Sequence, residues 1–385
     1  MKSRRLDELD LLRGLSVIGM LLVVTPGRWE QNFSWLVHAP WEGLVPADMI
    51  FPGFLFCVGY ALPLSLSKRI GAGESSRRLA GHFLTRGLAL IGIGVLLNLL
   101  QTFNWENVRL PGILQTIAVC WLLVGGLLLV ANRCRAAGEW NPRLDLPAAC
   151  GIVLLATYWI LLAFVPVPGY GANRFDSVGS WPVFIDRAVF GVSHLWIWGR
   201  TDGIVTYDPE GLLSTLSAST NVLIGAIFAS LYLRDPKKFT AARQIGAGAA
   251  LMAAGLAASL FYPPIKQIWT GSFALFSSGL ALALLGGFSL LVKLDLAAKL
   301  LFPAKVYGSN ALLVFVISGL TFATFDIPFI PVDEQIVSFR VFGYGVFSSF
   351  IPDSKSASLA FAFAFVCLLY PLLWYLNSRR WFLKI

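Results

Sequence analysis

Long apolar runs constrain this chain more than any other feature. A bilayer core about 30 Å thick is crossed by roughly 20 apolar residues in a helix, and runs of this kind recur along the whole sequence. Of the 385 residues, 57% are hydrophobic and 13% are charged, whereas a soluble domain has about 25% charged residues. The sequence therefore predicts an all-α polytopic membrane protein, a single transmembrane domain over residues 1–385, with helices near 9–25, 47–67, 82–100, 111–131, 147–165, 211–232, 244–262, 270–292, 305–325 and 356–377, about ten in all.

Positive charge predicts the orientation of this bundle. With the N-terminus inside, few of the 30 lysines and arginines lie on the outer side: Arg28, Arg109, Arg174, Arg187, Arg200, Lys266, Arg340 and Lys355. Because Lys and Arg are enriched in cytoplasmic loops, both termini are expected to be cytoplasmic, and the net charge of +9 does not indicate nucleic acid binding. The five cysteines have no paired spacing, so neither a disulfide nor a metal site is expected.

The first predicted helix is expected to be an uncleaved membrane helix and not a signal peptide. Its basic start is interrupted by Asp7, Glu8, Asp10 and Arg13, and no small-residue cleavage site follows. The longer irregular segments then fall outside, at 26–46, 166–210 and 326–355.

The outer segments carry the residues that suit a ligand. Segment 166–210 is rich in aromatic, acidic and amide groups, a mixture that suits sugar binding, although an interfacial aromatic belt explains it equally well. His194 in this segment is either a substrate contact or a solvated residue. The apolar stretch 334–352 is compatible with a surface helix or with a homodimer contact.

The stretch "WLVHAPWEGLVPADMIFPGFLF" (35–56) places a histidine and an aspartate beside the second predicted helix. Pro40, Gly43 and Pro46 turn the backbone between His38 and Asp48, so the two side chains can meet. A carboxylate that orients an imidazole produces a general base near neutral pH. The alternatives are a solvated histidine and an aspartate that only favours the helix N-terminus.

Cations on the predicted inner side form a second group. Arg13 and Arg86 lie in the first turns of apolar segments, and a short loop beside them carries Lys68, Arg69, Arg77 and Arg78. Such a cluster can hold the phosphates of a nucleotide-bearing cofactor. Orientation and attraction to anionic lipid also explain these cations, and His82 at the same side is interpreted as interfacial.

Further polar groups lie at membrane depth on the outer side. Asp208 and Glu210 precede the sixth predicted helix, Lys266 and Trp269 lie in "PPIKQIWTGSF", and Asn310 lies in the ninth helix. Polar residues at such depth are candidates for function, although the two carboxylates also suit helix capping.

Six blocks in order carry a family resemblance. "LDLLRGLSVIGMLLV", the His38 block, "GILQTIAVCW", "DPEGLLSTLSASTNVLIG", "PPIKQIWTGSFAL" and "GSNALLVF" together resemble the heparan-alpha-glucosaminide N-acetyltransferase family and its bacterial relatives. The resemblance implies transfer of an acetyl group from cytosolic acetyl-coenzyme A (acetyl-CoA) to the amine of a glucosamine on the far side. It also implies that His38 is catalytic and is accompanied by Asp48. The chain departs from the family at Thr25, Glu42 and Thr116, of which the first two lie close to the expected site, so the acceptor is left open.

The resulting prediction joins the two sides of a bacterial inner membrane. The coenzyme phosphates are held by inner cations among Arg13, Lys68, Arg69, Arg77, Arg78 and Arg86. The acceptor, glucosamine or a related amino sugar, is held by Trp41, Glu42, Asp208, Glu210 and Trp269. His38 acts either as a base for direct transfer or as an acetylated intermediate, and Lys266 or Asn310 steadies the oxyanion. The alternatives are a sugar or small-molecule transporter and a membrane scaffold.

Overall fold

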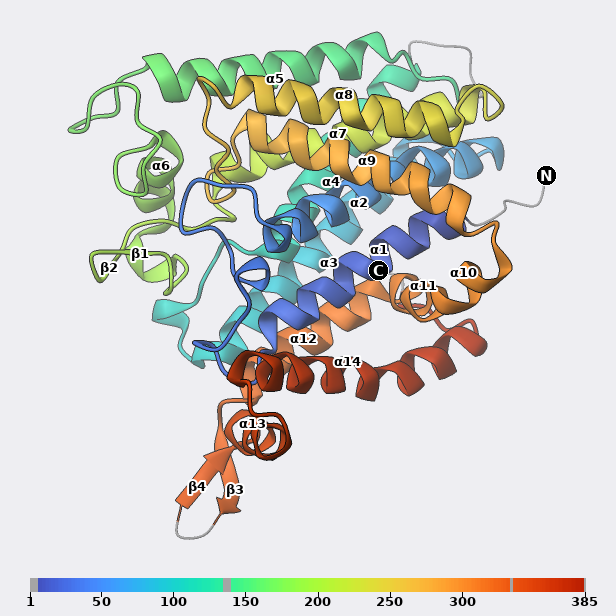
Figure 1. The fold of residues 1–385 in the computed structure, drawn as a ribbon. Helices are drawn as coiled ribbons and strands as arrows, with labels where there is room; N and C mark the ends of the chain where they lie inside the picture. Colours follow the sequence, from blue (N-terminus) through green and yellow to red (C-terminus); the bar gives the residue numbers. More distant parts are fainter. Residues whose placement is uncertain (1–5, 134–139, 333–334, 384–385) are drawn as a thin grey trace.

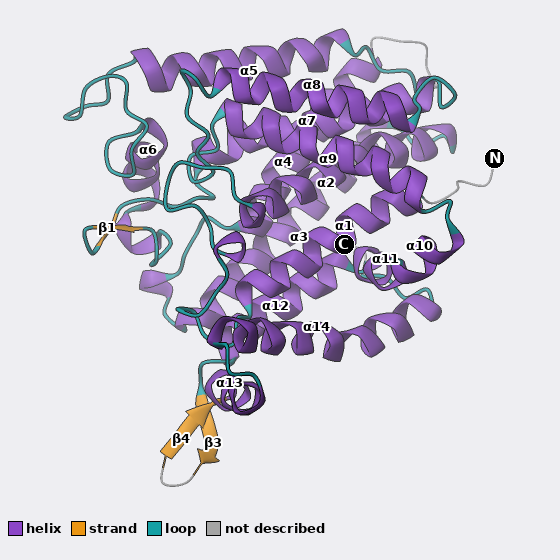
Figure 2. Cartoon of the chain, in the orientation of Figure 1, coloured by secondary structure: helices purple, strands orange, loops and turns teal. Residues whose placement is uncertain are grey.

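The computed structural model describes residues 6–133, 140–332 and 335–383, and helices dominate it (Figures 1 and 2). The helices are α1 (Asp7–Val24), α2 (Pro46–Gly71), α3 (Ser76–Thr102), α4 (Ile113–Arg133), α5 (Asp145–Phe164), α6 (Trp181–Phe190), α7 (Leu212–Arg234), α8 (Ala241–Ala258), α9 (Gly271–Leu291), α10 (Asp295–Leu300), α11 (Phe302–Ser309), α12 (Ala311–Thr324), α13 (Phe339–Phe350) and α14 (Ser354–Ser378). The predicted all-α class is confirmed. Cys134, counted among the unpaired cysteines, lies outside the described residues.

Short elements occupy the connecting segments. They are the 3-10 turns η1 (Ser34–Leu36), η2 (Trp105–Asn107) and η3 (Val192–His194), the antiparallel pair β1 (Arg200–Thr201) and β2 (Ile204–Val205), and the antiparallel pair β3 (Pro328–Val332) and β4 (Gln335–Ser338).

Membrane-length helices make up most of the bundle. Within the described residues, seven helices are long and apolar enough to cross a membrane, namely α2, α3, α4, α5, α7, α9 and α14. The number rises to eight if α11 and α12, which meet at an angle of 82°, form one broken span. Each of the ten predicted segments coincides with helix, but α1 and α8 do not meet the same standard. The prediction of about ten spans is therefore supported for seven or eight of them.

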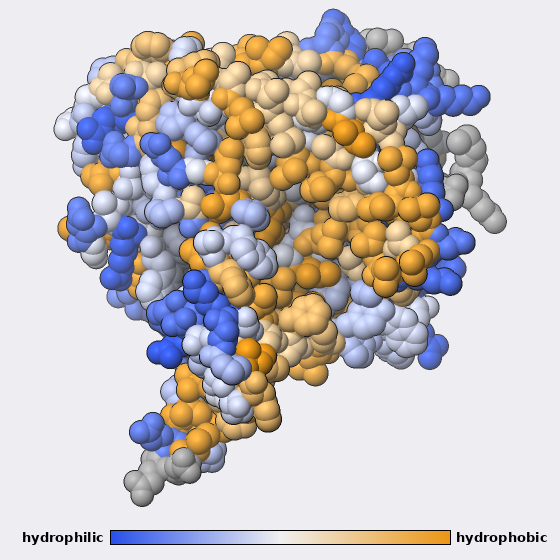
Figure 3. Space-filling view, in the orientation of Figure 1, coloured by the Kyte–Doolittle hydropathy of each residue, from blue (hydrophilic) through white to orange (hydrophobic). Residues whose placement is uncertain are grey.

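Surface polarity agrees with a membrane-spanning bundle. Figure 3 shows a broad apolar band over the helices, with hydrophilic residues gathered toward the two ends of the bundle. In Figure 1 the segments around α6, β1 and β2 lie at one end, and the N-terminal start of α1 and α10 lie at the other. We call these the loop-rich end (segments 25–45, 165–211 and 259–270) and the opposite end.

Close packing of α2 against α7 fixes the start of α2 at the loop-rich end. A methyl group at Gly59 would overlap the carbonyl of Val222, and one at Gly225 would overlap the carbonyl of Phe56. Small residues let helix backbones approach closely in a membrane. These glycines therefore allow α2 and α7 to run side by side, with Asp48 near the beginning of α7.

At the bottom of Figure 1, α13 packs against α14 through Phe339, Phe347 and Phe361, and the β3–β4 hairpin projects from the bundle. Arg340 is buried at its base, where it donates to Asp326 Oδ1 at 2.7 Å and to the carbonyl of Pro26 at 2.5 Å. The outward side chains of Phe329, Ile336 and Phe350 are exposed. Most of the predicted apolar stretch 334–352 is thus a helix on a short hairpin, although residue 334 lies outside the described residues.

Candidate active site

His38 and Asp48 meet at the loop-rich end, as their spacing predicted. His38 follows η1, Asp48 lies in the first turn of α2, and His38 Nδ1 is 2.8 Å from Asp48 Oδ1. The backbone N–H of Ala39 donates to Asp48 Oδ2 at 3.1 Å. The aspartate side chain has no exposed surface, whereas 43% of the histidine side chain is exposed. The buried carboxylate therefore fixes the ring through Nδ1, while Nε2 stays on the accessible side.

Lys266 completes this group from a distant part of the chain. Its Nζ is 3.3 Å from Asp48 Oδ1, 3.0 Å from His38 Nδ1 and 3.2 Å from His38 Nε2. Nearly equal distances to the two ring nitrogens place the amine over the face of the ring and not along either lone pair. Only 11% of the Lys266 side chain is exposed. Burial lowers the pKa of Lys266, against the opposing attraction of Asp48 and Glu210.

Backbone contacts join the loop of His38 to the loop of Lys266. Glu42 and Ile265 form an isolated antiparallel bridge, and the N–H of Gly43 donates to the carbonyl of Pro264 at 3.0 Å. Gln267 Nε2 donates to the carbonyl of Ala39 at 2.9 Å. Hydrogen bonds thus join the two loops near His38. They set the position of the Lys266 amine relative to the His38 imidazole.

Side chains on one face of α7 make hydrogen bonds to the loop that carries Lys266. Ser214 Oγ donates to the carbonyl of Gln267 at 3.4 Å, and Ser217 Oγ donates to the carbonyl of Trp269 at 2.6 Å. Asn221, one further turn along, accepts from Trp269 Nε1 at 2.9 Å. Positions i, i+3 and i+7 lie on one face of a helix, so three α7 side chains act on the same loop.

The backbone of this loop is unusual at Trp269. Its φ is +50°, in the left-handed region that non-glycine residues rarely adopt. The Tyr158 hydroxyl donates to the carbonyl of the preceding Ile268 at 2.5 Å. Trp269 is 1% exposed and packs edge-on against Phe51 and Phe273. Trp269, predicted to hold the acceptor, therefore lies in the core beneath the site.

Arg109 binds the two predicted carboxylates. It donates to Asp208 through Nε at 2.8 Å and through Nη2 at 2.5 Å, and it also pairs with Glu210. The N–H of Trp196 donates to Asp208 Oδ2 at 2.9 Å. Burial alone would lower the pKa of Arg109, but Asp208 and Glu210 raise it above its ordinary value. Burial raises the pKa of Glu210, against the attraction of Arg109.

These contacts change how the acceptor candidates are understood. Asp208 is fully buried, with both of its oxygens bonded within the protein, so it organises the cluster and does not face a ligand. Glu42, in the same loop as His38, carries an exposed carboxylate. Trp41 lies nearby, with its Nε1 donating to the carbonyl of Phe175 at 2.7 Å and its ring edge-on to Tyr207.

Asn310 occupies a different part of the molecule. It lies at the break between α11 and α12, where its Nδ2 donates to the carbonyl of Trp381 and its Oδ1 accepts from the N–H of Leu383. Both polar atoms are thus engaged with the C-terminal segment. Within the described residues no hydrogen bond joins Asn310 to His38 or Lys266, so Lys266 is the better placed of the two oxyanion candidates.

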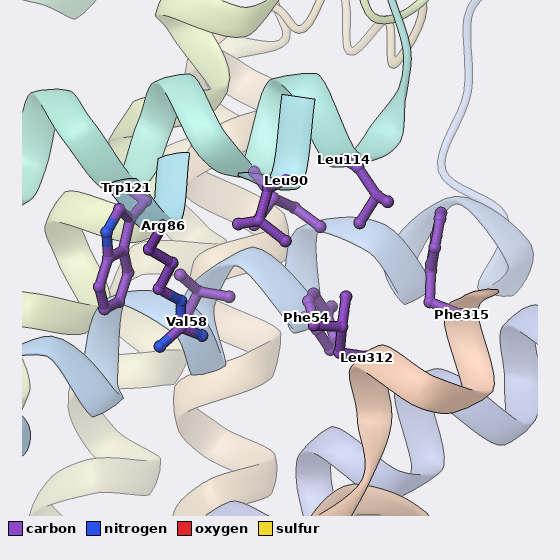
Figure 4. A pocket seen from close by; sticks show the side chains of 9 residues that line it. Phe54, Val58, Arg86, Leu90, Leu114, Trp121, Leu312 and Phe315 are labelled. Carbon is purple, nitrogen blue, oxygen red and sulfur yellow. The ribbon is translucent and has the colours of Figure 1, made fainter. Parts of the chain in front are cut away.

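Arg86 faces a cavity inside the bundle. Figure 4 shows its side chain with Trp121, Phe54, Leu312 and Phe315 around that space, which measures about 60 Å³. The guanidinium lies 4.4 Å from the centre of the Trp121 ring, and Nε is buried without a hydrogen-bond partner. Among the described residues no carboxylate is paired with Arg86.

A second cavity continues from the first toward the site. It measures about 40 Å³ and shares Phe54, Ile117 and Phe315 with the Arg86 cavity. It also reaches Ile50 and Phe51, which directly follow the first turn of α2 that carries Asp48. Small apolar spaces therefore line α2 from Arg86 toward the His38 group.

The other predicted coenzyme-binding cations have different surroundings. Arg13 donates to Asp10 at 3.3 Å, and Arg69 pairs with Glu74 at 2.9 Å. Lys68, Arg77 and Arg78 are exposed near the end of α2 and the start of α3. The structure thus singles out Arg86 as the cation of this group that lines an internal space.

This arrangement defines a multi-pass membrane protein with a buried charged group at one end of its bundle. Residues 5–137 match the family model described as heparan-alpha-glucosaminide N-acetyltransferase, catalytic. Over 268 residues the chain is 29% identical to the heparan-alpha-glucosaminide N-acetyltransferase of Mus musculus, covering 61% of this chain and 40% of that protein. Over 253 residues it is 31% identical to that of Homo sapiens, covering 57% of this chain and 37% of that protein.

The family resemblance seen in the sequence is therefore confirmed, and the chain is a distant relative of these two proteins. The region matched to the family model contains His38, Asp48, Arg86 and Arg109, and it ends before Glu210 and Lys266. The aligned region is 40% of the mouse protein and 37% of the human protein, so less than half of either relative is represented.

Proposed function

We propose that this chain is a transmembrane N-acetyltransferase that moves an acetyl group from acetyl-CoA to the amine of glucosamine or a related amino sugar. The observation that carries the proposal is the group of His38, Asp48 and Lys266, with distances of 2.8 to 3.3 Å between their polar atoms. It combines an oriented base with a cation. Amide formation from an amine and a thioester needs both of these groups.

The transfer itself follows from the roles of these side chains. His38, oriented by Asp48, takes a proton from the acceptor ammonium, so that the free amine can attack the carbonyl carbon of the thioester. The Lys266 ammonium stabilises the negative charge on the carbonyl oxygen. A nitrogen–carbon bond forms, the carbon–sulfur bond breaks, and the thiolate takes the proton from His38. His38 then removes the second proton from the nitrogen and releases it to solvent, so that the amide is neutral. A route through acetylated His38 uses the same side chains and differs in its first nucleophile.

The donor would reach this group from within the bundle. Arg86 supplies a positive charge that no carboxylate among the described residues pairs with, and the two cavities beside α2 extend from it toward Asp48. Guanidinium groups bind phosphate through charge-assisted hydrogen bonds. Arg86 would bind a phosphate of the coenzyme, with the exposed cations Lys68, Arg77 and Arg78 assisting at the predicted cytoplasmic surface.

The acceptor would approach from the loop-rich end, which the charge pattern predicts to be periplasmic in a bacterial inner membrane. Glu42 is exposed in the loop of His38 and attracts an ammonium group. Trp41 offers an aromatic surface in the same loop. An amino sugar presents both an ammonium and hydroxyl groups, which suits this combination.

The test is acetyl transfer by the full chain reconstituted in vesicles with acetyl-CoA and glucosamine. We expect release of the coenzyme thiol together with N-acetylated sugar. His38→Ala should lower the rate by about 100- to 10,000-fold while the affinity for the coenzyme is kept. His82→Gln is the matched control, because His82 lies near the start of α3, away from the Lys266 group. Sugar uptake without thiol release would instead indicate a transporter and overturn the proposal.

A further inference from the structure

The amine of Lys266 lies within reach of the base to which the proposed mechanism brings the acceptor amine. A base must lie within about 2.6 to 3.2 Å of the nitrogen whose proton it removes. Lys266 Nζ meets the distance part of this condition, at 3.0 Å from His38 Nδ1 and 3.2 Å from His38 Nε2. Because it lies over the face of the ring, the side chain has to rotate toward the Nε2 lone pair before a proton can pass. The protein therefore holds a primary amine of its own beside the proposed base.

The loop that carries this amine is held in place. The side chain of Lys266 is 11% exposed, and the carbonyls of the three residues that follow it accept hydrogen bonds from Ser214, Tyr158 and Ser217. The hydrogen bonds between residues 42–43 and residues 264–265 fix the other side of the loop. Lys266 is therefore a fixed part of the site and not a mobile surface lysine.

Protonation is what separates Lys266 from a competing substrate. Its amine is the same functional group as the amine of an amino sugar. Asp48 Oδ1, at 3.3 Å, favours the ammonium form, which is not nucleophilic. Burial favours the neutral form and lowers the pKa of Lys266, so the neutral amine is more accessible here than at an exposed lysine.

We propose that Lys266 is an internal acetyl acceptor, which is modified by the donor when no amino sugar occupies the site. The inference rests on the proposed acetyl transfer. The Lys266 ammonium first loses one proton to solvent. The neutral amine then attacks the thioester, His38 takes a second proton from Nζ, the Nζ–carbon bond of an amide forms, and the carbon–sulfur bond of the thioester breaks. The thiolate leaves with the proton that His38 received, so the products are acetyl-lysine and free coenzyme thiol.

The modification would switch off the site. Acetylation removes the positive charge beside Asp48, which is fully buried, and it leaves an acetamide group against the ring of His38. The acetamide has the same chemical form as the product of sugar acetylation and occupies the same position. An enzyme that has donor but no acceptor would therefore consume one acetyl group and stop.

Mass spectrometry of the full chain after incubation with acetyl-CoA alone tests this proposal. We expect one acetyl group on the peptide that contains Lys266, suppression by added glucosamine, and a decrease on the order of 100-fold in His38→Ala. Lys305 is the internal control, because its Nζ is also paired, at 2.8 Å from Asp7 Oδ2, but in α11. Preincubation with the donor should decrease the transfer activity of the wild type, whereas Lys266→Arg should keep whatever activity it starts with.

The outcomes separate this inference from the function beneath it. Acetylation of glucosamine without any acetyl-Lys266 would overturn the inference and leave the proposed function standing. Equal labelling of Lys305, or full labelling of Lys266 in His38→Ala, would indicate uncatalysed chemistry and also overturn it. Absence of acetyl transfer to lysine, glucosamine and every other amine offered would instead overturn the proposed function.

Discussion

Most buried charges at the loop-rich end are paired with an opposite charge, whereas the arginine at the internal cavity is not. Around His38, three buried carboxylates have a counter-charge: Asp48 has Lys266, and Asp208 and Glu210 have Arg109. Arg86 has an aromatic face and apolar walls, with no carboxylate among the described residues. Buried charges are costly unless they are paired.

This difference assigns different tasks to the two regions. A paired group is already organised, as catalysis requires, because it does not need to reorganise during the reaction. An unpaired arginine beside a cavity is incomplete until an anion arrives. Under the proposed function, the loop-rich end would be the reaction site, and the Arg86 cavity would bind the donor.

The largest expected effect comes from breaking a pair. Arg109→Met leaves Asp208 and Glu210 buried without their cation, and removal of one partner from a buried ion pair costs about 3–5 kcal/mol. Thermal unfolding of the purified chain measures this change. Lys238→Met is the control, because Lys238 and its partner Asp235 are 78% and 40% exposed, and exposed pairs contribute about 0–1 kcal/mol. Equal destabilisation by the two substitutions would contradict the comparison.

The second prediction concerns the unpaired cation. Arg86→Met leaves no carboxylate behind, so the unfolding midpoint should stay unchanged or rise. Binding of acetyl-CoA should weaken, because a hydrogen bond to a charged group contributes about 1.5–3 kcal/mol, which corresponds to about 10- to 100-fold in affinity. Calorimetry with the coenzyme measures the loss. Lys293→Met, at an exposed lysine, controls for the change in net charge, and an equal loss of affinity there would argue against a specific Arg86 contact.

A smaller effect is expected where α7 supports the Lys266 loop. Ser217→Ala leaves the buried carbonyl of Trp269 without its donor, which costs about 1–3 kcal/mol. Acetyl transfer should slow because the amine of Lys266 is held less firmly. Ser219→Ala is the control, since Ser219 Oγ donates to Leu216 within the same helix. If both substitutions left the rate of acetyl transfer unchanged, the hydrogen bond from Ser217 would have no role in positioning Lys266.

The smallest effect is a change in how stability depends on pH. It arises at Asp186, a buried carboxylate of this end that has no ion pair among the described residues. Burial raises the pKa of Asp186 to about 7, while the N–H of Leu212 donates to it and opposes the shift. The folded protein then binds this proton more tightly than the unfolded chain. Its contribution to stability is therefore present at low pH and is lost as the pH rises toward about 7.

Asp186→Asn should remove that part of the pH dependence. Unfolding midpoints between pH 5 and pH 8 would fall less steeply in the variant than in the wild type, because the amide stays neutral throughout. Identical slopes would show that Asp186 does not titrate in this range.

The local part of the site could be predicted from the sequence. His38 and Asp48 are ten residues apart, and the prolines and glycine between them force a turn that brings the side chains together. The helices followed from apolar runs because each run has to cover about 30 Å of bilayer core. Both predictions depend on segments of fewer than thirty residues, in which chain geometry leaves few alternatives.

The remaining contacts depend on tertiary packing. Lys266 is 228 residues from His38, and Arg109 is 99 residues from Asp208. Sequence reasoning noted Arg109 as one of few outer cations and the carboxylates as polar groups at depth, yet nothing local indicates which partners meet. Trp269 was assigned to the acceptor because aromatic residues suit sugars, but its left-handed backbone turns the ring into the core. The break at Asn310 likewise interrupts a run that hydropathy predicts as one helix.

The hydrogen bonds between the two site loops are made largely by main-chain atoms, at the bridge of Glu42 with Ile265 and at the bond from Gly43 to Pro264. Main-chain hydrogen bonds do not depend on which side chain is present at position 42. Over generations, that position can exchange its carboxylate for an amide or a hydroxyl while His38 and Lys266 stay in register. If the proposed function holds, acceptor preference can therefore change at position 42 without disturbing the reaction chemistry.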